Sequence, residues 1–194
     1  SGYAEMHYRP IGVVGAISPW NWPMMISIWQ IAPSLRMGNT VVIKPATNTP
    51  VIGYKMVEIM LEAGVPAGVV NFVAGSGSEI GDLLVEDPRV RFIGFTGSKD
   101  VGVHIFEKAA KVQKGQRWLK RVTAEMGGKD AIIVDSSADI ESAVEGIVTS
   151  AFGFSGQKCS ACSRVLVHAD IYDQIVDGVV ARTGEVVTVG SGLE

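Results

Sequence analysis

The chain of 194 residues has only two cysteines and no long uninterrupted apolar segment. Two cysteines cannot build the disulfide framework of a small secreted domain, so we expect a reduced, intracellular protein. The stretch from Pro10 to Leu35 has no charged residue, but Ser18–Pro23 breaks it with two prolines and an asparagine. Each half is too short to cross a bilayer, and we therefore expect no membrane span.

The chain also has no large excess of basic or acidic residues and no recognisable targeting signal. The 17 basic and 20 acidic residues give a net charge of −3, which excludes a broad basic surface. We therefore expect neither a nucleic-acid partner nor an acidic membrane partner. The N-terminus has no basic region followed by an apolar stretch and a cleavage site, so no signal peptide is expected. The expected compartment is the cytoplasm, or the mitochondrial matrix if the source is eukaryotic.

Short β-rich apolar runs alternate with longer runs of helical periodicity. Strands are expected at residues 11–17, 40–43, 69–73, 90–95, 119–124, 131–134 and 164–167. Helices are expected at residues 24–37, 50–63, 79–85, 98–111, 139–154 and 171–181. This alternation predicts an α/β protein with a Rossmann-like open parallel sheet and helices on both faces, followed by the start of a second α/β domain. A basic stretch at 108–121 marks the approach to the boundary between the two.

Polar or glycine-rich features follow four of the predicted strands. They are Asn21, Lys44, Gly75–Gly77 and Thr96–Ser98. In an open α/β sheet such links line the ligand crevice, and a Ser98 cap would leave free helix amides for an anion. The glycine spacing is not the dinucleotide fingerprint, so a simple turn with tight helix packing explains it equally well. No Walker A loop is present, which argues against a nucleoside triphosphatase.

Glu125 and Cys159 are candidates for acid–base and nucleophilic chemistry. Glu125 ends a predicted strand and precedes two glycines, which suits a general base that must move, although a surface glutamate is the alternative. Cys159 follows Lys158, whose charge and the nearby backbone amides would favour a thiolate; an inert buried thiol is the alternative. With Cys162 it forms a C-x-x-C motif. We expect no metal, because the three histidines lie at no recognisable zinc spacing, and the motif comes too late in the chain for a thioredoxin-like disulfide.

Five motifs together resemble the aldehyde dehydrogenase superfamily. They are Pro19–Pro23 (PWNWP), Asn39–Pro45 (NTVVIKP), Phe95–Ser98 (FTGS), Glu125–Gly128 (EMGG) and Gly156–Cys159 (GQKC). Within it, residues 119–130 and 150–163, together with the basic lead-in at 114–116, are most similar to the branch of 1-pyrroline-5-carboxylate (glutamate-semialdehyde) dehydrogenases. The resemblance implies three parts: residues 1–8 as the end of an oligomerisation arm or a tag, 9–126 as a dinucleotide-binding domain, and 127–194 as the N-terminal part of a catalytic domain.

The resemblance also implies the roles of the site residues. Cys159 would attack an aldehyde, Asn21 would stabilise the oxyanion, and Glu125 would activate water to hydrolyse a thioester. Ser160 and Phe154 would contact the substrate. NAD, or NADP, would be bound by Ile17, Ser18, Pro19, Trp20, Lys44, Thr47, Gly77, Gly97, Ser98, Val101 and Gly127.

Two departures from the family pattern stand out. Many relatives have glutamate where this chain has Thr47, and a neutral residue would not repel the 2′-phosphate of NADP. Family members also continue well beyond residue 194, so we expect a fragment of a homo-oligomeric enzyme that is inactive by itself. Other readings stay open: an aldehyde dehydrogenase of another subclass, acting on succinate semialdehyde or an aliphatic aldehyde; a non-catalytic dinucleotide-binding fragment; or a thiol redox protein that uses Cys159 and Cys162.

Overall fold

The structure, a computed structural model, describes residues 2–190. The chain divides into two compact units, Ser1–Met126 and Gly127–Glu194. The division falls after Met126, where the sequence analysis places a boundary.

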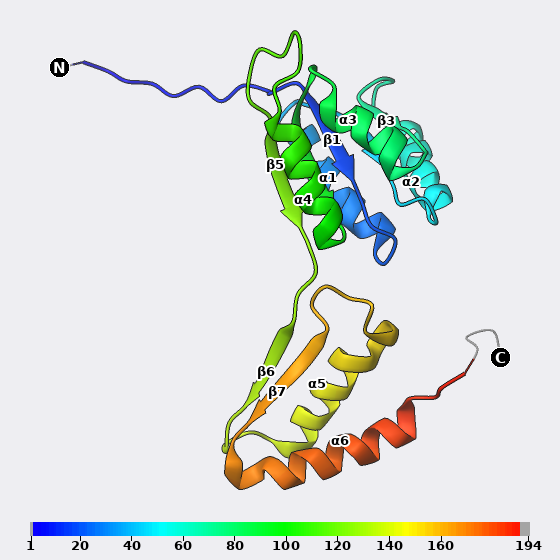
Figure 1. Cartoon of the computed structure of the whole chain (residues 1–194), viewed down its shortest axis with the longest axis vertical. Helices are drawn as coiled ribbons and strands as arrows, with labels where there is room; N and C mark the ends of the chain where they lie inside the picture. Colours follow the sequence, from blue (N-terminus) through cyan, green and yellow to red (C-terminus); the bar gives the residue numbers. More distant parts are fainter. Residues whose placement is uncertain (1, 191–194) are drawn as a thin grey trace. The chain divides into compact units, whose positions relative to one another are not determined.

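The first unit is built on a five-stranded parallel sheet (Figure 1). Its strands, in the spatial order β3-β2-β1-β4-β5, are Val70–Phe72, Thr40–Lys44, Val13–Ile17, Val90–Thr96 and Arg121–Glu125. The first strand in sequence is thus the central one. Strands β2 and β3 follow on one side of β1, and β4 and β5 follow on the other. The loops that leave β1 and β4 therefore run to opposite faces of the sheet, and open α/β sheets bind ligands at such a point.

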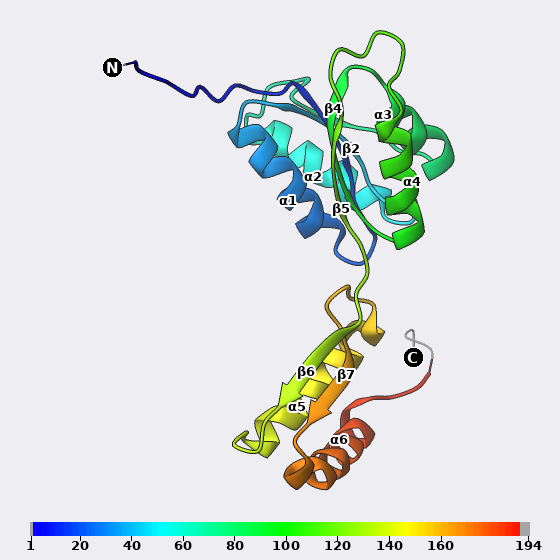
Figure 2. The same cartoon turned by 60° about the vertical axis from the view of Figure 1, so that its left-hand side comes forward.

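Four helices cover both faces of this sheet. They are α1 (Pro23–Arg36), α2 (Pro50–Glu62), α3 (Asp82–Glu86) and α4 (Lys99–Ala110). Figure 2 shows α1 and α2 on one face and α3 and α4 on the other. Along β1, Val14 and Ala16 pack into the core under α1 and α2, while Ile17 belongs to the core under α3 and α4. Alternation of side chains along a strand thus gives β1 two buried faces, which explains its continuous apolar sequence. The Rossmann-like fold class predicted from the sequence is confirmed.

The segment expected as one short helix at 79–85 forms differently. It starts as a π-helix at Gly77–Gly81, capped by Ser76, whose Oγ accepts from the amide of Glu79, and only then continues as α3. Gly75 makes this entry possible, because its φ is +155° and a Cβ there would lie 2.3 Å from Ile80. A side chain at residue 75 would therefore displace the start of the helix.

The second unit has two parallel strands and two helices. Strands β6 (Asp130–Val134) and β7 (Cys162–Val167) pair with each other, and the helices are α5 (Ile140–Phe152) and α6 (Tyr172–Val186). The core joins Val134 of β6 with Val144 and Ile147 of α5 and Ile175 of α6. The helices cover one face of the strand pair, because Ile133 and Leu166 on the other face are exposed.

Two helix ends in this unit differ from the sequence prediction. Asp139 caps α5 as expected, accepting from the amide of Ser142 at 2.8 Å. The helix ends at Phe152, however, and the prediction that it reaches Phe154 is wrong. Gly153 begins a 3-10 turn, and Phe154, Ser155 and Gly156 have φ values of +56°, +54° and +68°. A 3-10 turn at Ala169–Ile171 precedes α6, which extends five residues beyond the expected end. Across residues 2–190, every helix falls short of the length and apolarity that a bilayer crossing needs.

Candidate active site

The carboxyl ends of four parallel strands meet at one edge of the first unit. Ile17 pairs with Lys44 on one side and with Phe95 on the other, and Thr96 pairs with Glu125. Hydrogen bonds continue past the strand ends, from the amide of Ser18 to the carbonyl of Lys44 at 3.2 Å and from the amide of Gly97 to the carbonyl of Glu125 at 3.0 Å. The segments that lead to Asn21, Lys44, Ser98 and Glu125 therefore begin side by side.

The turn after β1 is held firmly at its base. Ile17 and Ser18 are buried, and the hydroxyls of Ser18 and Ser27 lie 2.8 Å apart. Pro19 is half-buried and Trp20 is exposed, while Asn21 is half-buried between the strand and the first residue of α1, Pro23. A proline at the first helical position fixes the backbone there, so the turn that carries Asn21 has a defined entry and exit.

Lys44 is the one lysine with a buried side chain at this edge. It is only 4% exposed, and its Nζ donates to the carbonyl of Pro45 at 3.2 Å. Burial lowers the pKa of Lys44 from its ordinary value, because the charged form loses water. Nearby, Thr47 is exposed, and a Cβ on Gly77 would meet no heavy atom within 4 Å. A dinucleotide fits these residues: the hydroxyls of its ribose can accept from the under-partnered ammonium, and open space adjoins Gly77.

The start of α4 offers backbone donors. The Oγ of Ser98 accepts from the amide of Val101 at 3.4 Å, which confirms the predicted cap. Gly97 packs so tightly that a Cβ would lie 2.6 Å from the ring of Phe95. Val101 is exposed on the first turn. The remaining N-terminal amides and the helix dipole favour an anion such as a pyrophosphate here.

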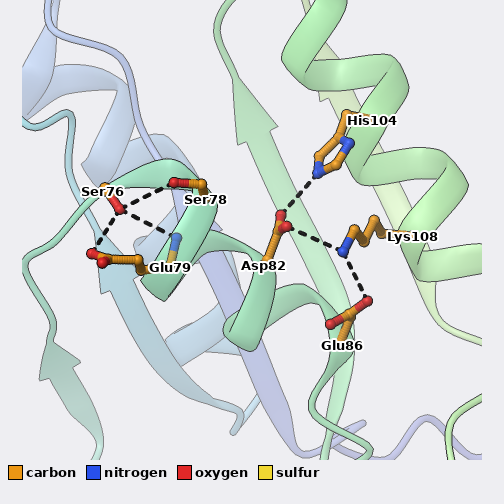
Figure 3. A network of polar contacts seen from close by, with 7 residues as sticks. All are labelled: Ser76, Ser78, Glu79, Asp82, Glu86, His104 and Lys108. Carbon is orange, nitrogen blue, oxygen red and sulfur yellow. Dashed lines mark hydrogen bonds and ion pairs between the residues drawn. The ribbon is translucent and has the colours of Figure 1, made fainter.

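An ion cluster joins α3 to α4 on the outer side of the unit (Figure 3). Asp82 contacts His104 Nε2 at 2.9 Å and Lys108 Nζ at 3.1 Å, and Lys108 also contacts Glu86 at 3.1 Å. Burial raises the pKa of Asp82, but hydrogen bonds from His104 and Lys108 outweigh it, and the net pKa lies below the ordinary value. The cluster thus ties the helix that follows Gly77 to the helix that begins beside Ser98.

Glu125 lines a mostly apolar hollow of about 420 Å³ between α1 and strands β4 and β5. Gln30 lines the same hollow, and its Nε2 donates to the carbonyl of Ile17 at 3.3 Å and to Oγ1 of Thr96 at 3.4 Å. The Oε1 of Gln30 is buried and has no hydrogen-bond partner among residues 2–190. The sequence alone does not point to Gln30, because one glutamine in an amphipathic helix gives no local signal of a link between two strand ends.

The glycines after Glu125 differ in their surroundings. Gly127 is exposed, and a Cβ there would meet nothing within 4 Å. Gly128 is close to the main chain of the second unit's cysteine loop, since its Cβ would lie 3.0 Å from the carbonyl oxygen of Cys159. Only glycine permits that approach without a shift of the backbone. Of these two glycines, Gly128 is therefore the one at which a side chain would lack space.

Cys159 stands on a tight turn of the second unit. The amide of Ala161 donates to the carbonyl of Lys158 at 3.1 Å, so Cys159 and Ser160 are the two central residues of the turn, and both are exposed. Cys159 is a free thiol. Among the described residues, none accepts a hydrogen bond from the amide N–H of Cys159. The turn thus presents a thiol together with an available backbone donor.

One expectation about this loop changes. Lys158, expected to favour the thiolate, directs its Nζ to the carbonyl of Thr149 at 3.4 Å, at the C-terminal end of α5. Phe154, expected to contact the substrate, is 58% exposed. Residues 2–190 contain no group of three or more histidine, cysteine or acidic side chains that could hold a metal ion.

The expected site residues thus fall into two groups. Those of the first unit surround the carboxyl edge of its sheet and the start of α4. Cys159, Ser160 and Phe154 lie on the loop between α5 and β7 in the second unit, and Gly127 is the first residue of that unit.

Comparison with known proteins places this arrangement in a family. The profile of the aldehyde dehydrogenase family matches residues 2–194. The chain belongs to the aldehyde dehydrogenase family. It is 58% identical over 192 residues to a 1-pyrroline-5-carboxylate dehydrogenase of Bacillus cytotoxicus, covering 99% of this chain and 37% of that protein. It is 61% identical over 176 residues to the same-named protein of Geobacillus thermodenitrificans, covering 91% and 34%.

Solved aldehyde dehydrogenase structures agree with this assignment. The chain matches a 1-pyrroline-5-carboxylate dehydrogenase from Thermus with bound NAD, with a TM-score of 0.86 and 49% identity, covering 93% of this chain and 35% of that one. It matches a betaine aldehyde dehydrogenase from Staphylococcus aureus in complex with NAD+ with a TM-score of 0.84 and 36% identity, covering 92% and 34%. The chain therefore spans about a third of the length of these relatives.

Proposed function

We propose that this chain supplies the nucleophile, the general base and most of the dinucleotide site of an enzyme that oxidises an aldehyde to a carboxylic acid with NAD or NADP. The observation that carries the proposal is the turn of residues 158–161, which exposes the Cys159 thiol beside its own amide N–H, for which the described part of the chain offers no acceptor. A thiol without a stabilising donor would be an ordinary surface cysteine. A thiol with a donor at the same residue can add to a carbonyl and stabilise the oxygen that becomes negative.

In the first half of the reaction, the thiol of Cys159 gives up its proton to water as its sulfur bonds to the aldehyde carbon, and the carbonyl oxygen takes the negative charge. The amide N–H of Cys159 and the side-chain amide of Asn21 donate to that oxygen. NAD or NADP, held by residues of the first unit, would supply the acceptor for the hydride; its loss from the same carbon would re-form the C=O bond and leave a thioester on Cys159. The side chains of this chain supply orientation and charge stabilisation throughout.

In the second half, Glu125 removes a proton from water as the water attacks the thioester carbon. The carbon–sulfur bond breaks, the carboxylic acid leaves, and the thiol of Cys159 is restored. The position of Glu125 at the exposed end of β5, followed by the unhindered Gly127, supports a base whose side chain can change position.

For the dinucleotide, Lys44 would donate to the ribose near the adenine, and Gly97 and Ser98 would meet the pyrophosphate at the start of α4. The segment from Ile17 to Trp20, at the end of β1, would also contact the dinucleotide. Thr47 is exposed and uncharged, which supports acceptance of both NAD and NADP.

For the aldehyde, we propose glutamate semialdehyde, the open form of 1-pyrroline-5-carboxylate, as the substrate. The support is the name shared by relatives that are 58–61% identical over more than nine-tenths of this chain. Ser160, next to Cys159 on the turn, would contact the substrate carboxylate, and the exposed Phe154 would contact its aliphatic chain.

The test is a substrate panel with the full-length protein that contains this chain, following NADH or NADPH formation. We expect glutamate semialdehyde to give the highest kcat/KM. A preference for succinate semialdehyde or an aliphatic aldehyde would assign another subclass. Calorimetric NAD binding with no aldehyde turnover and no acylation of Cys159 would contradict an enzymatic role.

A further inference from the structure

The loop that carries Cys159 is fastened to one turn of helix α5. On the N-terminal side of the cysteine, Lys158 Nζ donates to the carbonyl of Thr149 at 3.4 Å. On the C-terminal side, the amide of Cys162 donates to Oγ of Ser150 at 3.2 Å. Two adjacent residues near the end of α5 thus hold both flanks of the turn. Neither contact involves Cys159 or Ser160.

The last residue of the turn is anchored independently. Ala161 is buried, with 8% of it exposed, and its amide closes the turn on the carbonyl of Lys158. The preceding residues, Phe154–Gly156, follow a left-handed path that redirects the chain out of α5. Backbone in this conformation is costly for residues other than glycine, and it persists where surrounding contacts determine it. Beyond this left-handed segment, the contacts at Thr149 and Ser150 hold Lys158 and Cys162.

We propose that Ser150 and Thr149 are positioning residues for the nucleophile: they fix the Lys158–Cys162 turn so that the thiol and the amide N–H of Cys159 are presented together. This inference rests on the proposed function and extends it to residues that touch neither substrate nor cofactor. The reason is geometric. Attack and oxyanion binding need the sulfur and the N–H in a fixed relation, and small displacements of a catalytic group cost large factors in rate.

The sharpest variant is Ser150→Ala, which removes the hydroxyl that accepts from Cys162. Ser150→Thr keeps a hydroxyl and is expected to restore the wild-type behaviour. Ser163→Ala makes the same chemical change at an exposed residue of β7 and serves as the matched control. Lys158→Met removes the ammonium but keeps the chain length, which tests the other flank.

The first measurement needs no activity and uses the chain as it is. Hydrogen exchange at the Ala161 amide is expected to be about fivefold faster in Ser150→Ala, the equivalent of losing one hydrogen bond of about 1 kcal/mol. Iodoacetamide is expected to alkylate Cys159 faster than Cys162 in the wild type. In Ser150→Ala, the ratio of the two rates is expected to fall by a similar factor, because Cys162 is released. Ser163→Ala is expected to change neither quantity.

The second measurement uses the full-length protein. In Ser150→Ala, kcat/KM for the aldehyde is expected to fall at least about tenfold, while the Kd for NAD stays the same, and Ser150→Thr recovers the rate. Unchanged exchange and alkylation in Ser150→Ala would overturn the inference, and so would full aldehyde turnover despite a loosened turn. Absence of turnover in the wild type would instead contradict the proposed function, and the exchange and alkylation results would still decide whether α5 holds the turn.

Discussion

At the scale of single residues, Cys159 and Cys162 differ although two positions separate them. Cys159 is exposed at the tip of a turn, whereas Cys162 is half-buried at the start of β7, with its Sγ donating to the carbonyl of Arg164 at 3.2 Å. A thiol engaged with a carbonyl and shielded by a strand is the poorer nucleophile.

Single substitutions of the two cysteines test this difference. With Cys159→Ala, thiol acylation by an aldehyde in the presence of NAD is expected to disappear, because the exposed sulfur is lost. With Cys162→Ala, acylation is expected to remain near the wild-type rate. Mass spectrometry of proteolytic peptides measures both. Modification found on Cys162 in the wild type would show that the two roles have been assigned the wrong way round.

Thr47 offers a second test at the residue scale. Thr47→Glu places a carboxylate on an exposed loop after β2, near Lys44. We expect NADP binding to weaken at least about tenfold, since like charges are forced together, while NAD binding is kept. Dissociation constants from calorimetry for both nucleotides, with Thr47→Gln as the uncharged control, give the answer. If NADP binding weakens equally in Thr47→Glu and Thr47→Gln, the 2′-phosphate does not lie beside residue 47.

At the scale of elements, the start of α4 and the cluster that ties it to α3 together support the proposed dinucleotide site. The cap at Ser98 and the contacts of Asp82 act on the same helix, one at its first turn and one along its side. Loosening either is expected to reduce both stability and cofactor binding.

For the cap, Ser98→Ala is expected to lower the free energy of unfolding by about 1 kcal/mol and to weaken NAD binding. Urea denaturation and calorimetry measure the two effects. Asp139→Ala removes the equivalent cap of α5, which the first unit does not contain. It is expected to destabilise its own unit and to leave NAD binding unchanged. Loss of NAD affinity in Asp139→Ala would mean that the effect is a general one of folding.

For the cluster, the pKa of Asp82 in the folded state lies below its ordinary value. Its ionised form therefore stabilises the folded state, and this contribution is complete above the usual pKa of an unfolded aspartate, about 4. The contribution is lost as the pH falls through the lower pKa that Asp82 has in the folded state. We expect Asp82→Asn to be less stable than the wild type at pH 7, with the difference shrinking below pH 4. Urea titrations from pH 7 to pH 3 test this, with the exposed Glu62→Gln as the control. A constant difference would refute the electrostatic account.

The sequence predicts most of these elements but not their junctions. Strands β1, β2 and β4 are clear because both faces are buried and their sequences are uniformly apolar. The π-helical entry at Gly77 and the left-handed run at Phe154–Gly156 depend on contacts with residues distant in the chain, such as the close approach of Ile80 to Gly75. For the site, motifs indicate the residues that perform chemistry. Residues that hold them, such as Gln30 and Ser150, act through one or two hydrogen bonds that leave no pattern in the sequence.

At the scale of the whole molecule, the two units have separate hydrophobic cores. Two clusters belong to residues of the first unit and the third to residues of the second. Nearly all residues proposed to bind the dinucleotide lie in the first unit, whereas Cys159, the proposed nucleophile, lies in the second. Cofactor binding and thiol chemistry are therefore expected to be separable.

This separation gives a prediction for residues 1–126 produced alone. Because this segment contains its own sheet and both of its cores, it is expected to fold and to bind NAD within a few-fold of the affinity of the whole chain. Circular dichroism tests the folding and calorimetry the binding, with Ser98→Ala in the same segment as the control for specific binding. A folded segment without NAD affinity would show that the second unit contributes essential cofactor contacts.

The central position of β1 has a consequence for how the protein is made. As the chain leaves the ribosome, β1 meets β2 early, but its second neighbour, β4, is synthesised only after two helices and another strand have emerged. Until then one edge of the most apolar strand has no partner, and such edges invite pairing with other chains. Slowing translation just before Val90 is therefore expected to increase aggregation of the nascent protein, whereas slowing it after Glu125 is not.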